Sequence, residues 1–273
     1  MTTTRMLGSI AATAGAMVLA GCGMIGGLMP GRGEPEAPPV MVKTAADYAR
    51  AINHPNRPAA DAEDDAARKP AEILAFIGVE EGDTVFEMEA GGGWYSEIFS
   101  RAVGPDGEVV MQYPEEFESF YADALVVRLA GARLPNVRVS RTHFDDLDAA
   151  DGSADVVTWI LGPHELYFRP DESSQGFGDP AAAFAEVARI MKDDGVFLVI
   201  DHAAPSGAPT STGGTTHRID PAVILGLAVG AGLELDAQTD ILANPDDNRE
   251  ILVFDPSVRR QTDRFVFRFV KGS

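Results

Sequence analysis

The sequence has few cysteines, few basic residues and only a short apolar run near its start. A single cysteine, Cys22, among 273 residues excludes an intramolecular disulfide and a zinc site built from several cysteines. Lys and Arg number 22 against 42 Asp and Glu, which gives a net charge of −20. This acidic balance argues against a nucleic-acid partner, because binding the phosphate backbone requires a dense basic surface.

The first 22 residues have the pattern of a processed export signal. Arg5 is the only charged side chain before residue 32, and the apolar stretch 10–20 is too short to span a bilayer as a permanent helix. Leu19-Ala20-Gly21-Cys22 resembles the bacterial lipobox, in which a peptidase cuts before the cysteine and the thiol then carries diacylglycerol. An ordinary secretory signal with a chance cysteine is the alternative.

These features predict the organisation of the chain. Residues 1–21 are expected to be a lipoprotein signal peptide, with Cys22 as the lipidation site. Residues 22–43 are rich in Gly and Pro and predict a flexible, lipid-anchored linker. The folded domain is expected over residues 44–273. The resulting localisation is the bacterial cell envelope, facing the periplasm, with membrane contact only through the anchor.

The rest of the chain alternates between strand and helix patterns. Five short apolar runs separated by helical segments predict a parallel sheet covered on both faces, and two further runs with no helix between them predict an antiparallel pair. The fold class is therefore α/β. The predicted strands are 84–88, 108–112, 137–140, 154–161, 196–201, 251–254 and 264–270. The predicted helices are 47–52, 61–77 with Pro70 as a kink or new start, 94–103, 117–130, 180–191 and 221–231.

The strongest local signal is the segment 85–94, VFEMEAGGGW. An apolar strand ends at the acid Glu87, turns through Gly91, Gly92 and Gly93, and enters a helix. Glycines let the backbone approach a ligand, and a helix N-terminus offers free amide groups. An acid at the strand end suits a ribose hydroxyl or an ammonium group. The pattern favours a nucleotide-like ligand over a tight strand-to-helix turn.

At this point the sequence resembles the class I S-adenosylmethionine-dependent methyltransferases, over about residues 70–200 and more loosely beyond. Residues 87–93 look like their first motif, 181–200 look like a helix-turn-strand common in the family, and 155–157 occupy the fourth-strand position. Three stretches, 91–98, 162–167 and 262–265, are similar to a branch of exported bacterial proteins predicted to be methyltransferases. The resemblance implies a seven-stranded, Rossmann-like sheet with an antiparallel last strand, and S-adenosylmethionine as cofactor.

The resemblance also implies cofactor contacts, with departures from the family pattern. Glu89 replaces the usual first glycine of the first motif, so its side chain must point away or crowd the ligand. Gln112 replaces the acid that ends the second strand, and His143 stands where an acid often follows the third. The implied cofactor-binding residues are Glu87, Gly91, Gly92, Gly93, Gln112, His143 and Phe144.

Histidines form a second group of candidates. His143, His164, His202 and His217 follow predicted strands, and ligands of open α/β sheets bind at the carboxyl ends of strands. One of the catalytic candidates His164, His202 and His217 could act as a general base toward a hydroxyl or amine. Alternatively they bind a divalent metal together with Asp201 or Asp220, or they are ordinary loop histidines. Their spacing matches no dense ligand motif, so no metal site is predicted.

The function predicted from these features is methyl transfer from S-adenosylmethionine to an unidentified small molecule by an envelope lipoprotein. A supply of the cofactor is not assured outside the cytoplasm. The alternative function is therefore a non-catalytic lipoprotein that binds a nucleoside-like small ligand on the same fold, and a third possibility is that the chain is not exported. No feature of the sequence indicates an oligomeric state.

Overall fold

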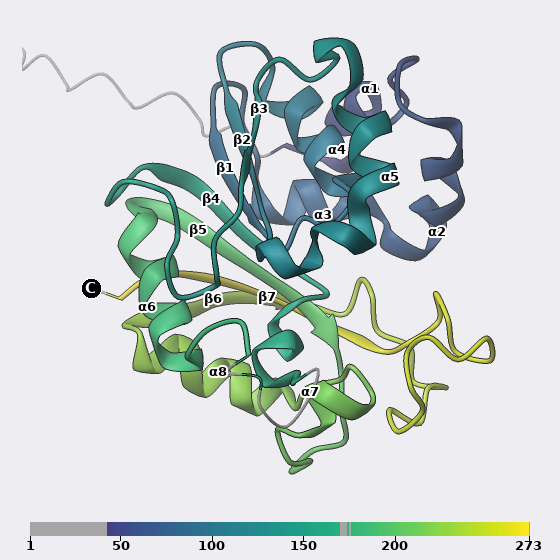
Figure 1. Cartoon of the computed structure of the whole chain (residues 1–273), viewed down its shortest axis with the longest axis vertical. Helices are drawn as coiled ribbons and strands as arrows, with labels where there is room; N and C mark the ends of the chain where they lie inside the picture. The colour runs from purple at the N-terminus through teal and green to yellow at the C-terminus, as the bar shows by residue number, and fades with distance from the viewer. Residues whose placement is uncertain (1–42, 170–173, 175, 273) are drawn as a thin grey trace, which may run out of the picture. The chain divides into compact units, whose positions relative to one another are not determined.

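A mostly parallel, seven-stranded sheet organises the part of the chain that the computed structural model describes, residues 43–169, 174 and 176–272 (Figure 1). The strand order is β3-β2-β1-β4-β5-β7-β6. Neighbours from β3 to β5 pair in parallel, whereas β7 is antiparallel to both β5 and β6. This confirms the predicted α/β sheet with an antiparallel last strand. The predicted signal peptide, Cys22 and nearly all of the linker lie outside the described residues.

With one exception, the strands coincide with the predicted apolar runs, five of them to within one residue, while β5 begins five residues before its predicted start, at Met191, which was expected to end a helix. The strands are β1 Thr84–Met88, β2 Glu108–Gln112, β3 Val137–Ser140, β4 Ala154–Ile160, β5 Met191–His202, β6 Leu233–Thr239 and β7 Arg264–Lys271. The exception is the sixth strand, which was predicted at 251–254. Those residues form a loop in which Leu252 and Phe254 are exposed. The true β6 lies at the sheet edge and buries only Leu233 fully, so its sequence has no apolar run.

Helices cover both faces of the sheet, as predicted. In Figure 1, α1, α3, α4 and α5 lie over one face, and α6 and α8 lie over the other. The helices are α1 Ala49–Ile52, α2 Asp65–Arg68, α3 Pro70–Ile77, α4 Trp94–Val103, α5 Glu118–Leu129, α6 Pro180–Ile190, α7 Thr212–Thr215 and α8 Pro221–Gly230. Pro70 begins a new helix. The side chains of Asp179 and Asp220 cap α6 and α8 by accepting hydrogen bonds from backbone amides of the first turn. A proline follows each aspartate at the first helical position.

The two largest parts of the core lie on opposite faces of the sheet, because strand side chains alternate between the faces. Val85 of β1 packs with Ile98 of α4 on one face. Phe86 and Met88 pack on the other face, with Phe184 of α6. Both faces of the central strands are therefore buried, which leaves the ends of the strands as the places where polar chemistry can meet solvent or a ligand.

Within residues 43–169, 174 and 176–272, no helix is both long enough and apolar enough to cross a membrane.

Candidate functional site

Glu87 is the last-but-one residue of β1, and its carboxyl is buried under α4. It accepts a hydrogen bond from the Ser96 hydroxyl at 2.5 Å. Burial raises the pKa of this carboxyl to about 8, against the opposing effects of the Ser96 hydrogen bond and the charge of Arg128. Glu87 is therefore mostly protonated at neutral pH, and its partner Ser96 lies in the first turn of α4, which follows the glycine loop.

The glycine loop lies against α5. A Cβ at Gly92 would lie 2.8 Å from Ala124 Cβ, and one at Gly93 would lie 2.7 Å from Met111 Cε. Gly93 also has a left-handed backbone, with φ of 74°. Gly92 therefore requires glycine for close packing on α5, whereas Gly93 requires it for its left-handed backbone, because the end of the flexible Met111 side chain can move. Gly91 has more space, since a Cβ there would lie 3.4 Å from the Tyr121 ring, but its left-handed backbone, with φ of 56°, also favours glycine.

Glu89 adopts a left-handed backbone with φ of 49°, which is costly for a residue with a side chain. Its amide donates to Gln112 Oε1 at 3.0 Å, and its Oε2 accepts a 3.4 Å hydrogen bond from Trp159 Nε1. Its side chain thus points toward the end of β4. Burial and the nearby Glu165 carboxylate raise the pKa of Glu89 well above its usual range.

The predicted nucleoside contacts have other partners. Gln112 is fully buried and uses both ends of its amide, because Nε2 also donates to the Thr142 carbonyl at 2.6 Å. His143 is half exposed and lies 3.0 Å from Glu116 Oε1. Phe144 packs in the core, with its ring centroid 4.8 Å from that of Trp159. All three lie at the expected edge of the sheet.

The predicted catalytic histidines gather at the ends of β4 and β5. His164 lies in the single-turn 3-10 helix Pro163–Tyr167 after β4. Its ring Nδ1–H donates to Asp201 Oδ1, and its backbone amide donates to Asp201 Oδ2, each at 2.8 Å. His217 follows α7, and its Nδ1 lies 3.1 Å from His164 Nε2. His202 lies apart from this contact, with its ring centroid 6.2 Å from that of His164 and its Nδ1 2.7 Å from the Thr262 hydroxyl.

Glu165 completes the cluster and was not singled out in the sequence. Its Oε1 lies 3.0 Å from His217 Nδ1 and 3.3 Å from His164 Nε2. The available signal was its position directly after His164. The nitrogen and oxygen atoms of His164, Glu165 and His217 all lie within 4.8 Å of one another, which is the arrangement of a possible metal centre. These three residues are hereafter called the His-Glu-His cluster.

The pKa values of His164, Glu165 and His202 are shifted in different directions, so the three groups carry different charges at neutral pH. Burial alone would lower the pKa of His164, but Asp201 and Glu165 outweigh it and raise that pKa to about 10. Burial acts against ionisation of Glu165, yet hydrogen bonds from both histidines hold its pKa well below the usual range. Burial and the neighbouring charge of His164 lower the pKa of His202 well below its usual range. At neutral pH His164 is therefore cationic, Glu165 anionic and His202 neutral.

Several buried polar atoms at the same edge have no hydrogen-bond partner among the described residues. They include the hydroxyls of Tyr113 after β2, of Ser140 at the end of β3 and of Thr142 after β3, and Oε2 of Glu165 after β4. Buried polar groups are normally paired, so unpaired atoms at the carboxyl ends of β2, β3 and β4 fit a polar ligand that supplies the partners.

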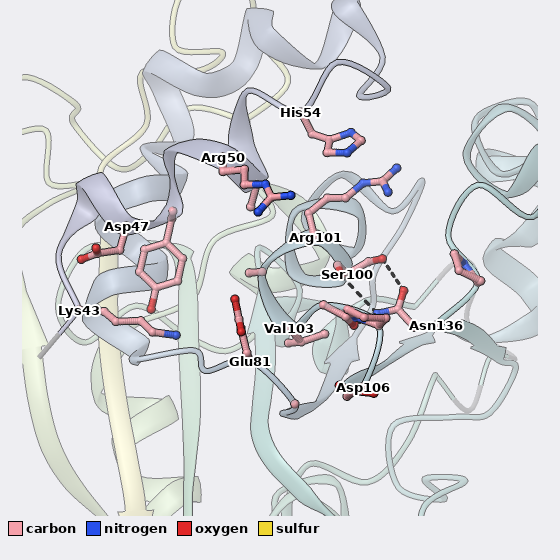
Figure 2. A pocket seen from close by; sticks show the side chains of 17 residues that line it. Lys43, Asp47, Arg50, His54, Glu81, Ser100, Arg101, Val103, Asp106 and Asn136 are labelled. Carbon is pink, nitrogen blue, oxygen red and sulfur yellow. Dashed lines mark hydrogen bonds between the residues drawn. The ribbon is translucent and has the colours of Figure 1, made fainter. Parts of the chain in front are cut away.

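A separate pocket of about 820 Å³ lies at the amino ends of the strands, opposite the carboxyl ends where the histidines gather (Figure 2). Its lining includes residues before β1, β2 and β3, namely Glu81, Asp106 and Asn136. The Asn136 side chain holds this edge through hydrogen bonds with Ser100 of α4. None of the site residues predicted from the sequence lines this pocket, so we place the candidate site at the carboxyl edge instead.

The local sequence similarity is to methyltransferases. Over 70 residues the chain is 36% identical to the uncharacterized methyltransferase YcgJ of Bacillus subtilis (strain 168), a match that covers 26% of this chain and 23% of that protein. Over 135 residues it is 27% identical to the ubiquinone/menaquinone biosynthesis C-methyltransferase UbiE of Stutzerimonas stutzeri (strain A1501), covering 49% and 47%. The chain spans less than half the length of each of these curated relatives.

Structural similarity extends over more of the chain. A SAM-dependent methyltransferase from Aquifex aeolicus matches with a TM-score of 0.51 at 18% identity, over 76% of this chain and 97% of that chain. No protein-family model matches the sequence. The fold is therefore the Rossmann-like methyltransferase fold that the sequence predicted.

Proposed function

We propose that this chain is a methyltransferase that uses S-adenosylmethionine to methylate a small molecule. The observation that carries this proposal is the meeting of two features at one edge of the sheet. The glycine loop follows β1, the His-Glu-His cluster is built after β4 and β5, and the Glu89 side chain extends from the loop toward Trp159 of β4. A donor held by the loop would lie beside polar groups suited to an acceptor.

The described residues offer contacts for the cofactor in two parts. Glu87 and the loop Gly91–Gly93 would hold the methionine and ribose portions. The Gln112 amide already bonds to the Glu89 amide and the Thr142 carbonyl, so the unpaired hydroxyls of Tyr113 and Thr142 are the further polar partners for the nucleoside. When bound, S-adenosylmethionine supplies an electrophilic methyl group on a sulfonium centre.

The remaining task of the protein is to orient the acceptor and to remove its proton where one must leave. His164 already carries a proton at neutral pH, so it serves as a hydrogen-bond donor and a positive charge. The groups able to accept a proton are the anionic Glu165, whose Oε2 has no partner among the described residues, and the neutral His202.

Calorimetric titration of the full chain with S-adenosylmethionine and S-adenosylhomocysteine tests the cofactor site. We expect micromolar binding that Gly91→Asp abolishes, because the added side chain enters the loop beside Tyr121. Gly131→Asp is the matched control: Gly131 has a similar φ of 61° but nothing within 4 Å of a Cβ. A folded wild-type chain that binds neither ligand at millimolar concentration would contradict the proposal.

Two departures from the methyltransferase sequence pattern favour the alternative function, in which the protein binds a nucleoside-like ligand without catalysis. Glu89 stands in place of a glycine, and Gln112, already bonded to the Glu89 amide and the Thr142 carbonyl, offers a ribose no charged acceptor. Release of S-adenosylhomocysteine in the presence of a panel of hydroxyl, thiol and amine acceptors distinguishes the two functions. Binding with no turnover on any acceptor would favour the ligand-binding function.

We further propose that the chain is a lipoprotein anchored at Cys22 in the bacterial envelope, with its domain facing the periplasm. The support is the signal-like stretch 1–21 and the lipobox-like residues before the cysteine. Labelling of cells with a radioactive fatty acid should mark the wild type and the control Ser9→Ala, but not Cys22→Ala. Equal fractionation of all three without label would exclude the anchor.

A further inference from the structure

Three ligand-type atoms converge within the His-Glu-His cluster, and their spacing is the starting point. His164 Nε2, Glu165 Oε1 and His217 Nδ1 are separated from one another by 3.0, 3.1 and 3.3 Å. Two imidazole nitrogens and a carboxylate oxygen are common ligands of divalent transition metals. The three residues come from two segments 53 positions apart along the chain.

The spacing agrees with a shared metal ion. Bonds of about 2.0–2.1 Å in a tetrahedral arrangement separate neighbouring ligand atoms by about 3.3 Å. The three observed separations are within about 0.3 Å of that value. A tetrahedral ion bound to these three atoms would have its fourth coordination position open to water or a ligand. Three protein ligands are typical of catalytic zinc sites, whereas structural zinc sites have four.

The surroundings of His164 support the same conclusion. Its other ring nitrogen donates to Asp201, so the ring is oriented with Nε2 toward the cluster. Histidine ligands of metals are generally held in this way by a carboxylate, which fixes both the tautomer and the ring orientation. Asp201 is fully buried and also binds the His164 backbone, so this orientation is fixed at two points.

His217 is held in a conformation that has an energetic cost. Its backbone is left-handed with φ of 53°, and its ring packs against those of Phe168 and Phe254, with centroids 5.6 and 4.8 Å away. Residues in such sparsely populated backbone regions concentrate at functional sites. The strained backbone and the two aromatic contacts direct Nδ1 at the other two atoms.

A metal-free hydrogen-bonded network is the competing explanation for the same distances. In that network the proton on His164 Nε2 can serve only one of its two close neighbours well. Oε2 of Glu165, a side chain about nine-tenths buried, still has no partner among the described residues. An ion coordinated through the carboxylate, or its water ligand, would satisfy that atom, whereas the network leaves it unpaired.

We propose that His164 Nε2, Glu165 Oε1 and His217 Nδ1 bind one divalent first-row transition metal ion, with Asp201 as the positioning residue behind His164. The site shares His164 and Glu165 with the acceptor side of the proposed methyltransferase, but metal binding can be measured without S-adenosylmethionine, since all the ligand atoms lie outside the glycine loop. Binding displaces the proton from His164 Nε2, as metal binding to histidine requires.

The test is metal titration of the full chain after treatment with a chelator and dialysis. Zn²⁺ is the calorimetric probe, and Co²⁺ reports nitrogen and oxygen coordination through its visible absorption. We expect one equivalent bound with micromolar or tighter affinity, together with a rise in Tm as the metal concentration increases. His217→Ala and Glu165→Gln should each weaken binding by at least roughly tenfold.

His54→Ala and His143→Ala are the controls, because both histidines lie outside the cluster and should leave affinity unchanged. His164→Ala removes the Asp201 contact as well, so the His217 and Glu165 variants decide the question, with circular dichroism to confirm folding. The proposal is overturned if the chelator-treated wild type binds neither ion at micromolar concentration. It is also overturned if folded His217→Ala and Glu165→Gln bind as tightly as the wild type.

Discussion

The carboxylate of Asp201 binds His164 twice, accepting from the ring Nδ1–H and from the backbone amide at 2.8 Å each. Asp201 is in β5 and His164 is in the turn after β4, so this contact joins the carboxyl ends of two paired strands. Both residues are buried, which strengthens charge-assisted hydrogen bonds relative to those in water. The position and the ring orientation of His164 therefore depend on one side chain.

Asp201→Asn should destabilise the protein and weaken its proposed metal site. The asparagine side chain has one acceptor oxygen, so its NH2 group would face one of the two N–H groups of His164. That N–H group would then be a buried donor without an acceptor. We expect a loss of roughly 2–4 kcal/mol in the free energy of unfolding, and weaker Zn²⁺ binding. Urea unfolding and calorimetry measure these. The exposed Asp151→Asn serves as control, and equal results for both variants would exclude the positioning role.

The ion pair between Arg218 and Asp247 should be essential for stability. Both side chains are fully buried, the two contacts measure 2.8 and 3.1 Å, and Arg218 also donates to the Ala203 and Ile251 carbonyls. Arg218→Ala leaves Asp247 buried without its counter-charge, and we expect a loss of about 3–5 kcal/mol in unfolding free energy.

The exposed pair of Arg141 with Glu118 provides the comparison for Arg218. Arg141→Ala should change the unfolding free energy little, because exposed ion pairs are weak. Denaturant unfolding of both variants measures the contrast. A similar small effect for both would show that the Arg218 pair does not hold the loop after β6 onto the end of β5.

Stability should fall with rising pH because of Glu87. Burial raises the pKa of its carboxyl from 4.5 to about 8, so between these values the folded state retains a proton that the unfolded state has lost. The stabilisation is complete below about pH 4.5 and is lost as pH rises through 8. Glu87→Gln removes this dependence. Unfolding measured at pH 5 and pH 9 should show a larger decline for wild type than for the variant, and parallel declines would contradict the raised pKa.

Gly213→Ala should disturb the cluster by steric overlap. Gly213 lies in α7, and a Cβ there would overlap the His164 carbonyl oxygen and lie 3.1 Å from Tyr167 Cβ. We expect a loss of about 1–3 kcal/mol, with weaker metal binding as α7 moves and displaces His217.

Gly226→Ala in α8 is the control for this substitution, because nothing lies within 4 Å of a Cβ at that position. Alanine has a higher helix propensity than glycine, so this variant should be slightly more stable than the wild type. Thermal unfolding compares the two. If both substitutions raise Tm, close packing of α7 on the turn after β4 is not required.

Much of the fold could be predicted from the sequence because its signals are local. The run 84–88 and the helix 94–103 were bounded correctly, since strands buried on both faces are continuously apolar and a glycine turn separates them from the helix. The sixth strand was predicted wrongly at 251–254. β6 lies at the sheet edge with alternating acidic residues, so it resembles a polar segment in the sequence, whereas Leu252 and Phe254 are apolar but exposed.

The candidate site was predictable only in part for the same reason. The sequence placed His143, His164, His202 and His217 at the carboxyl edge, because parallel strands direct all their carboxyl ends to one side. It could not show that Gln112 is engaged by two backbone groups or that Glu165 joins two histidines. Those contacts depend on side-chain direction and on loops that no periodic pattern specifies.

The sequence by itself determined six of the seven strands, the main helices and the carboxyl ends at which polar residues gather, because hydrophobic periodicity and glycine turns act between near neighbours. Only the tertiary structure decided which polar groups meet. Asp201 orients His164, α7 packs on the turn after β4, and His217 thereby reaches Glu165 across 52 positions of the chain. Such convergence follows from the packing of separate segments, and therefore no local pattern contains it.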